Sequence, residues 1–263
     1  MQVVGYRARV EDHAAILLAE DGAVTVETLA PGTDLSYRLG ERHCAGAVED
    51  ATPGTTRAAG DALVHHACEA ADAPYCPEHT SRWPCARCTG DCSKPIDACD
   101  EAHAVYLAAF APDTVKVGVT RAWRLETRLR EQGADRAAHL RTVADGRIAR
   151  QVEADIAADI GDRVRVPTKI AGFADTVDEA FWTGLCAEYD PLASYAFEYG
   201  LDLADRPLSE TLATGTVRGT KGRVAVLENS GSVYAVDLRD LVGYELEDGE
   251  ADRELQSSLG AFG

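Results

Sequence analysis

The chain has 263 residues, 46% hydrophobic and 27% charged, which is too apolar for a disordered protein and long enough for one sizeable core or two small domains. Its formal net charge is -18, so most of its surface should repel nucleic acid. Any binding of nucleic acid must therefore come from a local basic region.

The acidic composition also bears on the source and compartment. Few lysines, one methionine and a large acidic excess are typical of a protein from a halophilic archaeon, where the salt of the cytoplasm screens the repulsion between like charges. The alternative is an acidic protein from an ordinary organism with a GC-rich genome. The first ten residues do not resemble a signal peptide, and no apolar stretch is long enough to span a membrane. We expect a cytoplasmic protein with reduced thiols, so its eight cysteines favour metal binding over disulfides.

Residues 1–43 are predicted to form an N-terminal β unit. Apolar and polar positions alternate along it, and Asp21-Gly22 has the composition of a hairpin turn. A segment rich in Gly and Pro follows at 46–60 and is expected to be a linker.

Residues 44–103 are a Cys/His-rich segment. Cys76-x2-His79 and Cys85-x2-Cys88 have the spacing at which a tight turn presents two donors to one tetrahedral zinc ion. The nine candidate ligands are Cys44, Cys68, Cys76, His79, Cys85, Cys88, Cys92, Cys99 and His103. We assign Cys44, Cys68, Cys76 and His79 to one ion, and Cys85, Cys88, Cys92 and Cys99 to a second, with His103 in reserve.

An alternative is that some of these cysteines are buried free thiols, as we expect for Cys186 on an apolar helix face. We interpret the one or two zinc ions as structural, because the segment has too little apolar content to fold without them.

Residues 104–204 are predicted to be the core. Apolar runs at 105–110 and 115–120 flank a turn at Pro112-Asp113, which indicates a hairpin. An arginine-rich helix is expected at 121–132. A second helix has an apolar stripe, and Glu153 lies beside it, where its carboxylate could point into a cleft.

The charge changes sign in this core. Between His103 and Gln151 the chain has nine basic and five acidic residues, a net charge of +4. Arginine suits a phosphate-binding cleft because it can donate two hydrogen bonds to one phosphate, and we single out Arg121, Arg124 and Arg128 as nucleic-acid ligands. The alternative is that these arginines pair with acidic neighbours, as Arg124 would with Glu131.

The C-terminal part is predicted to return to β structure. Residues 205–250 are expected to form a small β module, with Asn229-Ser230-Gly231 as a hairpin turn and with the N-terminal strands as candidates to complete it. Residues 251–263 are an acidic tail that we expect to fray.

The core resembles the GIY-YIG endonucleases in the order of its polar residues. Tyr106, Lys116-Val117-Gly118, Arg128 and a helical Glu153 carry the resemblance. The run from Cys99 to Ala134 is also similar to a prokaryotic family, carried as a domain of unknown function, that joins a Cys-rich segment to such a core. In that family the first metal cluster resembles two Cys-x2-Cys pairs, and Ala47 stands here where the partner of Cys44 would be.

We therefore expect an α+β fold: a GIY-YIG-like mixed sheet with flanking helices, as the resemblance implies, together with a zinc-ribbon-like insert and small β units at both termini. The resemblance also implies that Tyr106 positions or deprotonates the attacking water, that Arg128 stabilises the scissile phosphate, and that Glu153 holds one Mg²⁺ or Mn²⁺ ion. Lys116 stands at the second motif's tyrosine position and would lower the pKa of a phenol or bind phosphate.

Two departures from the nuclease pattern stand out. Ala104-Val105 replaces its opening Gly-Ile, and the asparagine that usually closes the core is missing, because the only asparagine is Asn229. We therefore expect either a metal-dependent, endonuclease-like phosphodiesterase acting on DNA or RNA, or a zinc-containing nucleic-acid-binding protein with a catalytically silent core. A protein-interaction scaffold is a third hypothesis, but it leaves the basic region unexplained.

Overall fold

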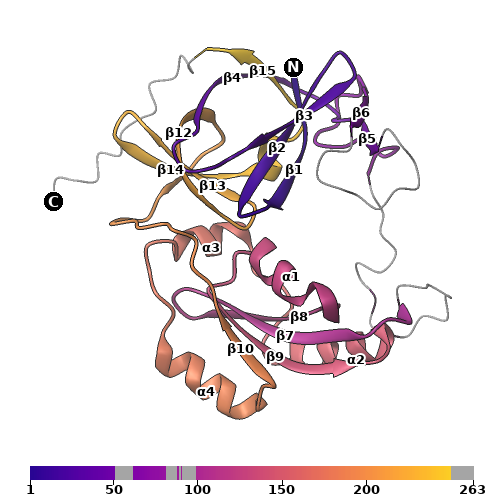
Figure 1. Ribbon diagram of the computed structural model, residues 1–263, viewed down its shortest axis with the longest axis vertical. Helices are drawn as coiled ribbons and strands as arrows, with labels where there is room; N and C mark the ends of the chain where they lie inside the picture. The colour runs from indigo at the N-terminus through magenta and orange to yellow at the C-terminus, as the bar shows by residue number, and fades with distance from the viewer. Residues whose placement is uncertain (51–61, 81–87, 89, 91–98, 250–263) are drawn as a thin grey trace. The chain divides into compact units, whose positions relative to one another are not determined.

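The structure, a computed structural model, describes residues 1–50, 62–80, 88, 90 and 99–249 (Figure 1). The chain divides into two compact units: unit 1 joins Met1–Thr80 to Pro207–Gly263, and unit 2 is Ser81–Arg206. Unit 1 is mainly strands and unit 2 combines a sheet with helices, so the α+β class is as predicted. The predicted tail at 251–263 and most of the predicted linker lie outside the described residues.

Unit 1 contains one large sheet. Its strands are β1 (Gln2–Val10), β2 (His13–Glu20), β3 (Ala23–Thr28), β4 (Asp34–Arg42), β5 (Ala47–Asp50), β6 (Leu63–His66), β11 (Leu208–Ser209), β12 (Ala213–Lys221), β13 (Val224–Asn229), β14 (Ser232–Asp237) and β15 (Tyr244–Asp248). Their order is β11-β14-β13-β12-β4-β15-β1-β2-β3-β6-β5. The last strand, β15, lies between β4 and β1, so the two predicted β units form a single sheet, with indigo strands beside yellow ones in Figure 1.

Tight turns and one shared core hold this sheet together. The predicted turns are two-residue hairpin turns: φ is positive at Asp21 and Gly22, and again at Ser230 and Gly231, as a turn that matches strand twist requires. Apolar side chains from both ends of the chain then pack in one cluster, which includes Val3, Ile16, Leu227, Val236 and Leu241, the last in helix α5 (Leu238–Leu241). Burial of these side chains couples the N-terminal strands to the C-terminal ones.

Unit 2 is built on a four-stranded sheet of order β10-β9-β7-β8, where β7 is His103–Phe110, β8 Thr114–Arg121, β9 Arg136–Val143 and β10 Ala193–Ala196. All three neighbouring pairs are antiparallel. The prediction that the core sheet would be mixed, with both parallel and antiparallel pairs, is therefore wrong. The physical reason is the strand order: β8 and β9 run in the same direction, but β7 lies between them and is antiparallel to both, so no parallel strands are neighbours.

Helices cover both faces of this sheet. The helical elements are η3 (Ala122–Arg124), α1 (Leu125–Glu131), α2 (Gly146–Ala157), α3 (Val166–Ala171) and α4 (Glu179–Tyr189). Alternate residues of β7 point to opposite sides: Val105 and Leu107 pack with α2 and α4, whereas Tyr106 and Phe110 pack with α1. This period of two decides that the Tyr106 side chain lies on the α1 side.

The five predicted segments and the two compact units divide the chain differently. The units separate at Thr80 and Ser81, inside the predicted Cys/His-rich segment 44–103. Cys44, Cys68, Cys76 and His79 thus belong to unit 1, and Cys88, Cys99 and His103 to unit 2. The reason is that the loops after β4 and β6 are tied to the sheet of unit 1 by backbone hydrogen bonds.

Candidate metal centre and candidate active site

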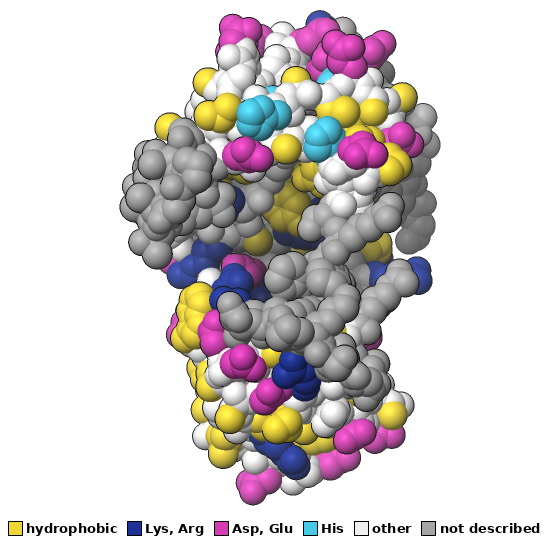
Figure 2. Space-filling view, turned by 90° about the vertical axis from the view of Figure 1, so that its right-hand side faces the viewer, with side chains coloured by type: hydrophobic (Ala, Val, Ile, Leu, Met, Phe, Trp, Pro, Cys, Tyr) yellow, Lys and Arg dark blue, Asp and Glu magenta, His cyan; other side chains and the backbone are white. Residues whose placement is uncertain are grey.

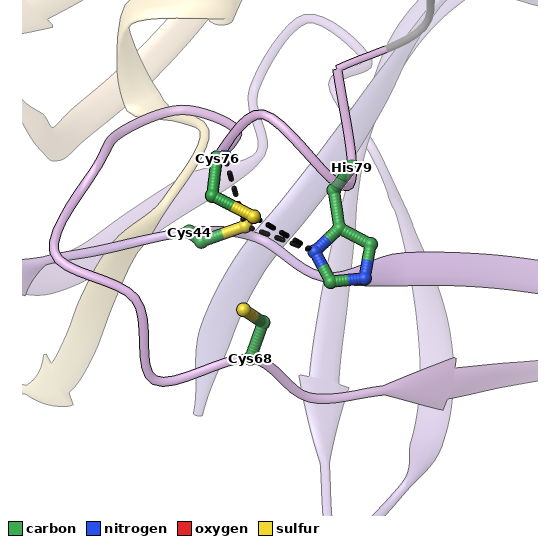
Figure 3. Close-up of side chains that lie close together, drawn as sticks. All are labelled: Cys44, Cys68, Cys76 and His79. Carbon is green, nitrogen blue, oxygen red and sulfur yellow. Dashed lines mark hydrogen bonds between the residues drawn. The ribbon is translucent and has the colours of Figure 1, made fainter.

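Four side chains of unit 1 converge on one point at the ends of two strands (Figure 3). Cys44 follows β4, Cys68 follows β6, and Cys76 and His79 flank a turn. Their three Sγ atoms and one ring nitrogen all lie within 4.8 Å of one another. The Nδ1 atom of His79 is 3.4 Å from Sγ of Cys44 and 3.3 Å from Sγ of Cys76. A tetrahedral zinc ion with ordinary Zn–S and Zn–N distances would place such atoms about 3.6 Å apart.

Backbone hydrogen bonds between the loops hold these ligands in place. Cys44 N donates to Ala70 O at 2.8 Å, and Ala45 N donates to Pro74 O at 2.9 Å. On the turn, the N–H of Thr80 donates to Cys76 O at 2.8 Å. These hydrogen bonds join loops that are far apart in the sequence and bring the four side chains to one place.

The cluster's electrostatics favour a thiolate at Cys44. Burial raises the pKa of the Cys44 thiol, but the N–H groups of Cys76 and Gly46, 3.2 and 3.4 Å from its Sγ, outweigh burial, so that pKa is lowered. The N–H of Ala70 lowers the pKa of Cys68, yet burial and the neighbouring thiols outweigh it and the pKa is raised. Since the thiolate is the form that binds metal, Cys44 is the thiol best prepared for it.

The donor set could hold a metal such as zinc. Three thiols and one imidazole would fill all four positions of a tetrahedral ion, which is the composition of a closed, structural site. Cys44 and Cys76 are buried and Cys68 and His79 are half-buried, so the ion would be partly shielded from solvent. The structure thus brings together the four residues that the sequence assigned to one ion.

The second predicted zinc set is only partly described. Cys85 and Cys92 lie outside the described residues, Cys88 is half-buried and Cys99 is buried. His103, the reserve ligand, has its Nδ1 2.7 Å from Glu101 O. Within the described ranges, the group at Cys44 is the only cluster of three or more candidate metal ligands.

In unit 2 the predicted catalytic side chains come from four different elements. Tyr106 lies on β7, Lys116 on β8, Arg128 on α1 and Glu153 on α2. Arg128 and Glu153 both act electrostatically on Tyr106 and on Lys116, which places all four in one neighbourhood. The structure therefore brings together a phenol, two cations and a carboxylate that are separated by up to 47 residues in sequence.

Tyr106 is fixed by the strand opposite it. It pairs with Gly118 in the β7–β8 ladder, and its ring lies across that glycine: a Cβ at Gly118 would be 2.6 Å from the phenol oxygen. Gln132 Nε2 donates a hydrogen bond of 2.5 Å to this oxygen. Burial raises the pKa of Tyr106, and although Arg128 and Gln132 oppose the effect, the phenol stays protonated at neutral pH.

Positive charge exceeds negative charge around Lys116. Burial and then the nearby Arg128 lower the pKa of Lys116 to about 8, against the opposite influence of Glu153. Arg150 also contributes, and its Nη1 donates to Oε2 of the buried Glu153 at 2.6 Å. Lys116, Arg128 and Arg150 are thus opposed here by two carboxylates, Glu153 and Asp162, and the remaining positive charge favours a bound anion such as phosphate.

Ion pairs reduce the charge of the basic region. Seven of its nine basic residues have an acidic partner: Arg121–Glu101, Arg124–Glu131, Arg128–Glu131, Arg130–Glu126, Arg136–Glu179, Arg147–Asp145 and Arg150–Glu153. The alternative interpretation is confirmed for Arg124, whose Nη2 is 3.0 Å from Glu131. On the face in Figure 2, acidic and basic side chains are likewise interspersed. Arg124 and Arg128 share the carboxylate of Glu131, however, so one positive charge is left over there.

A divalent cation at Glu153 would have few protein ligands. One oxygen of this carboxylate is engaged by Arg150. Mg²⁺ commonly binds through one or two carboxylates and keeps several waters, so a single carboxylate is compatible with Mg²⁺ or Mn²⁺ although it does not demand either.

Two residues of this site were missed in the sequence. Gln132 holds the phenol of Tyr106, and its signal was the Gln132-Gly133 pair at the end of the predicted helix. Arg150 holds Glu153, and its signal was the three-residue spacing on one helix.

Comparison with known proteins gives one family match. The model of a family described as Protein of unknown function (DUF2797) matches residues 32–246. Neither a curated protein nor a solved structure matches the chain. None of the helices in the described part of the chain has the length and apolar character needed to cross a membrane.

Proposed function

The chain belongs to the DUF2797 family, and we propose that it is a metal-dependent phosphodiesterase acting on nucleic acid. Its reaction site is the GIY-YIG-like core in unit 2, and a zinc ion in the Cys44 cluster stabilises unit 1. One observation carries the proposal: Tyr106, Lys116, Arg128 and Glu153, from four elements, lie in one electrostatic neighbourhood.

Tyr106 and Lys116 divide the work on the attacking water. Because Tyr106 stays protonated, its hydroxyl orients the water rather than deprotonating it. Lys116, with its pKa of about 8, is neutral often enough near neutral pH to take the proton. The water O–H bond breaks towards Nζ, the new O–P bond forms, and the bond to the leaving oxygen breaks, after which that oxygen takes a proton from solvent.

Arg128 and Glu153 serve the phosphate. The Arg128 guanidinium stabilises the negative charge that grows on the phosphoryl oxygens. Glu153 is the residue that would hold Mg²⁺ or Mn²⁺, which supplies Lewis-acid stabilisation of the phosphate when bound. Arg150 orients the Glu153 carboxylate through its 2.6 Å hydrogen bond.

The second candidate is a nucleic-acid-binding protein whose core is catalytically silent. The observation in its favour is that Glu153 is already neutralised by Arg150. In that case the same cations would bind phosphate without cleavage.

Single-turnover cleavage separates the two candidates. Purified protein is incubated with Mg²⁺ or Mn²⁺ and with single-stranded, duplex and branched DNA and RNA, beside a binding titration. Glu153→Gln should abolish cleavage and largely preserve binding, since the carboxylate serves the metal. Arg128→Ala should weaken both.

Two variants on the same unit serve as controls. Arg136, whose partner Glu179 lies 2.8 Å away, is not part of the site, so Arg136→Ala should leave cleavage unchanged. Glu188→Gln alters an exposed carboxylate on α4 and should do the same. Binding without cleavage anywhere in the panel would establish the silent core instead.

A further inference from the structure

Trp123 is an exposed aromatic residue beside the candidate active site. It lies in η3, between β8 and α1, and 69% of its surface is exposed, the largest fraction among the described exposed apolar side chains. The Cζ atoms of Arg121 and Arg124 are 6.0 and 5.9 Å from its ring centroid. An isolated aromatic ring among arginines differs from a protein-docking patch, in which apolar residues adjoin one another.

The indole is held in one orientation. Its Nε1 donates a hydrogen bond of 3.1 Å to Glu101, and the same carboxylate lies 3.5 Å from Arg121. An exposed indole gains nothing from burial, yet here it is oriented by a hydrogen bond that leaves most of the ring open to solvent. Because the ring is already ordered in the free protein, ligand binding would lose less side-chain conformational entropy.

Trp123 and its neighbouring arginines lie next to helix α1, which carries Arg128 of the candidate reaction site. Arg124 beside the ring and Arg128 of the reaction site share Glu131. Trp123 and Arg128 are five residues apart, about 8 Å along a helix axis.

We propose that Trp123 stacks on an unpaired base of a single-stranded nucleic acid whose phosphates contact Arg121 and Arg124. The inference rests on the proposed function and names its substrate class, a single strand or an unpaired end. A base in a duplex is already stacked and paired and must first be extruded, whereas a single-stranded base is free to stack on the ring. Arginines beside the ring add cation–π attraction and neutralise the backbone.

The test is fluorescence polarisation with labelled twelve-residue oligothymidine and oligouridine and a duplex of equal length. Mg²⁺ and Mn²⁺ are left out to prevent cleavage, no chelator is added, and the zinc content of each protein sample is measured. Wild-type protein should bind both single strands more tightly than the duplex, and the difference between the two reports a preference for DNA or RNA. Trp123→Ala should weaken single-strand binding about 5- to 150-fold, the usual effect of losing one stacking aromatic.

Matched variants separate stacking from other roles. Trp123→Phe keeps an aromatic face and should retain most of the affinity, whereas Trp123→Leu keeps apolar area only and should resemble Trp123→Ala. Leu192→Ala removes another exposed apolar side chain of unit 2 and should have no effect. Equal binding by the Leu and Phe variants would assign Trp123 to apolar docking and overturn the proposal.

The proposed function and this inference fail separately. If Trp123→Ala binds single strands within twofold of wild type while Arg128→Ala loses binding, the stacking role is wrong and the phosphate site stands. If the wild-type protein binds none of these probes, the stacking role is wrong, and the proposed function is decided by the cleavage panel, which also holds branched substrates.

Discussion

Replacement of Lys116 by methionine should stabilise the protein. Lys116 is only half-buried, so the lowering of its pKa from 10.5 to about 8 sets an upper limit: the folded state disfavours the charged ammonium by at most about 3 kcal/mol, at about 1.4 kcal/mol per pKa unit. Burial is the largest cause, followed by Arg128, and Arg150 acts in the same direction. Methionine has a similar length and no charge, but it forfeits the 3.3 Å hydrogen bond from Nζ to Asp162 O, at a cost of about 1 kcal/mol. The expected net gain at pH 7 is at most about 2 kcal/mol.

The pH dependence provides the sharper test. Lys116 loses its proton near pH 8 in the folded state and near pH 10.5 in the unfolded state, so between these values the unfolded chain binds more protons. The free energy of unfolding of the wild type therefore rises with pH across this window, and the advantage of Lys116→Met shrinks. Below pH 8 the advantage should be constant.

The assay is urea denaturation of both proteins at pH 7, 8 and 9.5, compared as a difference so that other titrating groups cancel. Lys169→Met is the matched control, because Lys169 Nζ donates to Gln132 O at 2.7 Å and its loss should destabilise by about 1 kcal/mol. A less stable Lys116→Met protein at pH 7, or a difference that does not change between pH 8 and 9.5, would refute the reasoning.

The remaining predictions concern the metal cluster and the Tyr106 ring. Elemental analysis should find about one zinc ion per chain from the Cys44 cluster, or two if the ligands outside the described residues form the second site. Cys76→Ser should lose one equivalent of zinc, whereas the control Cys186→Ser on α4 should lose none. In thermal melts, Gly118→Ala should destabilise the protein by about 1 to 3 kcal/mol, because its Cβ would be 2.6 Å from the Tyr106 ring. The control Gly184→Ala lies in a helix with open space around it and should stabilise the protein by up to about 1 kcal/mol. Retained zinc in Cys76→Ser, or equal melting temperatures for the two glycine variants, would contradict these expectations.

Local patterns in the sequence predicted local structure well. The turns at Asp21-Gly22 and Ser230-Gly231 need residues that tolerate positive φ, and those residues stand at these positions. Cys76 and His79 likewise fall on one turn because their three-residue separation fits it. Such features depend on neighbours in sequence, so the sequence alone expresses them.

Contacts between distant segments were harder to predict. The insertion of β15 between β4 and β1 has no local signature, since any antiparallel strand with the right faces could pair there. The charge count over residues 103–151 was misleading for the same reason: Glu101, Glu153 and Glu179 lie outside it, yet they pair with Arg121, Arg150 and Arg136. The halophilic interpretation depends on composition and stays a prediction.

The position of the metal cluster explains why its loss should affect more than a loop. His43 is next to Cys44, and its ring atom Nδ1 is 3.0 Å from Cys68 O. The backbone N–H of His43 donates to the O atom of Gly243, just before β15, at 3.1 Å. The Gln2 side chain on β1 donates to the same Gly243 carbonyl at 3.2 Å. The ligand loops therefore meet the strands at the place where the C-terminal strand enters the sheet between β4 and β1. Because four protein ligands would close the ion's coordination, its binding energy is available for folding. Metal removal should consequently loosen the β4–β15–β1 junction, on which the joining of the two ends of the chain depends.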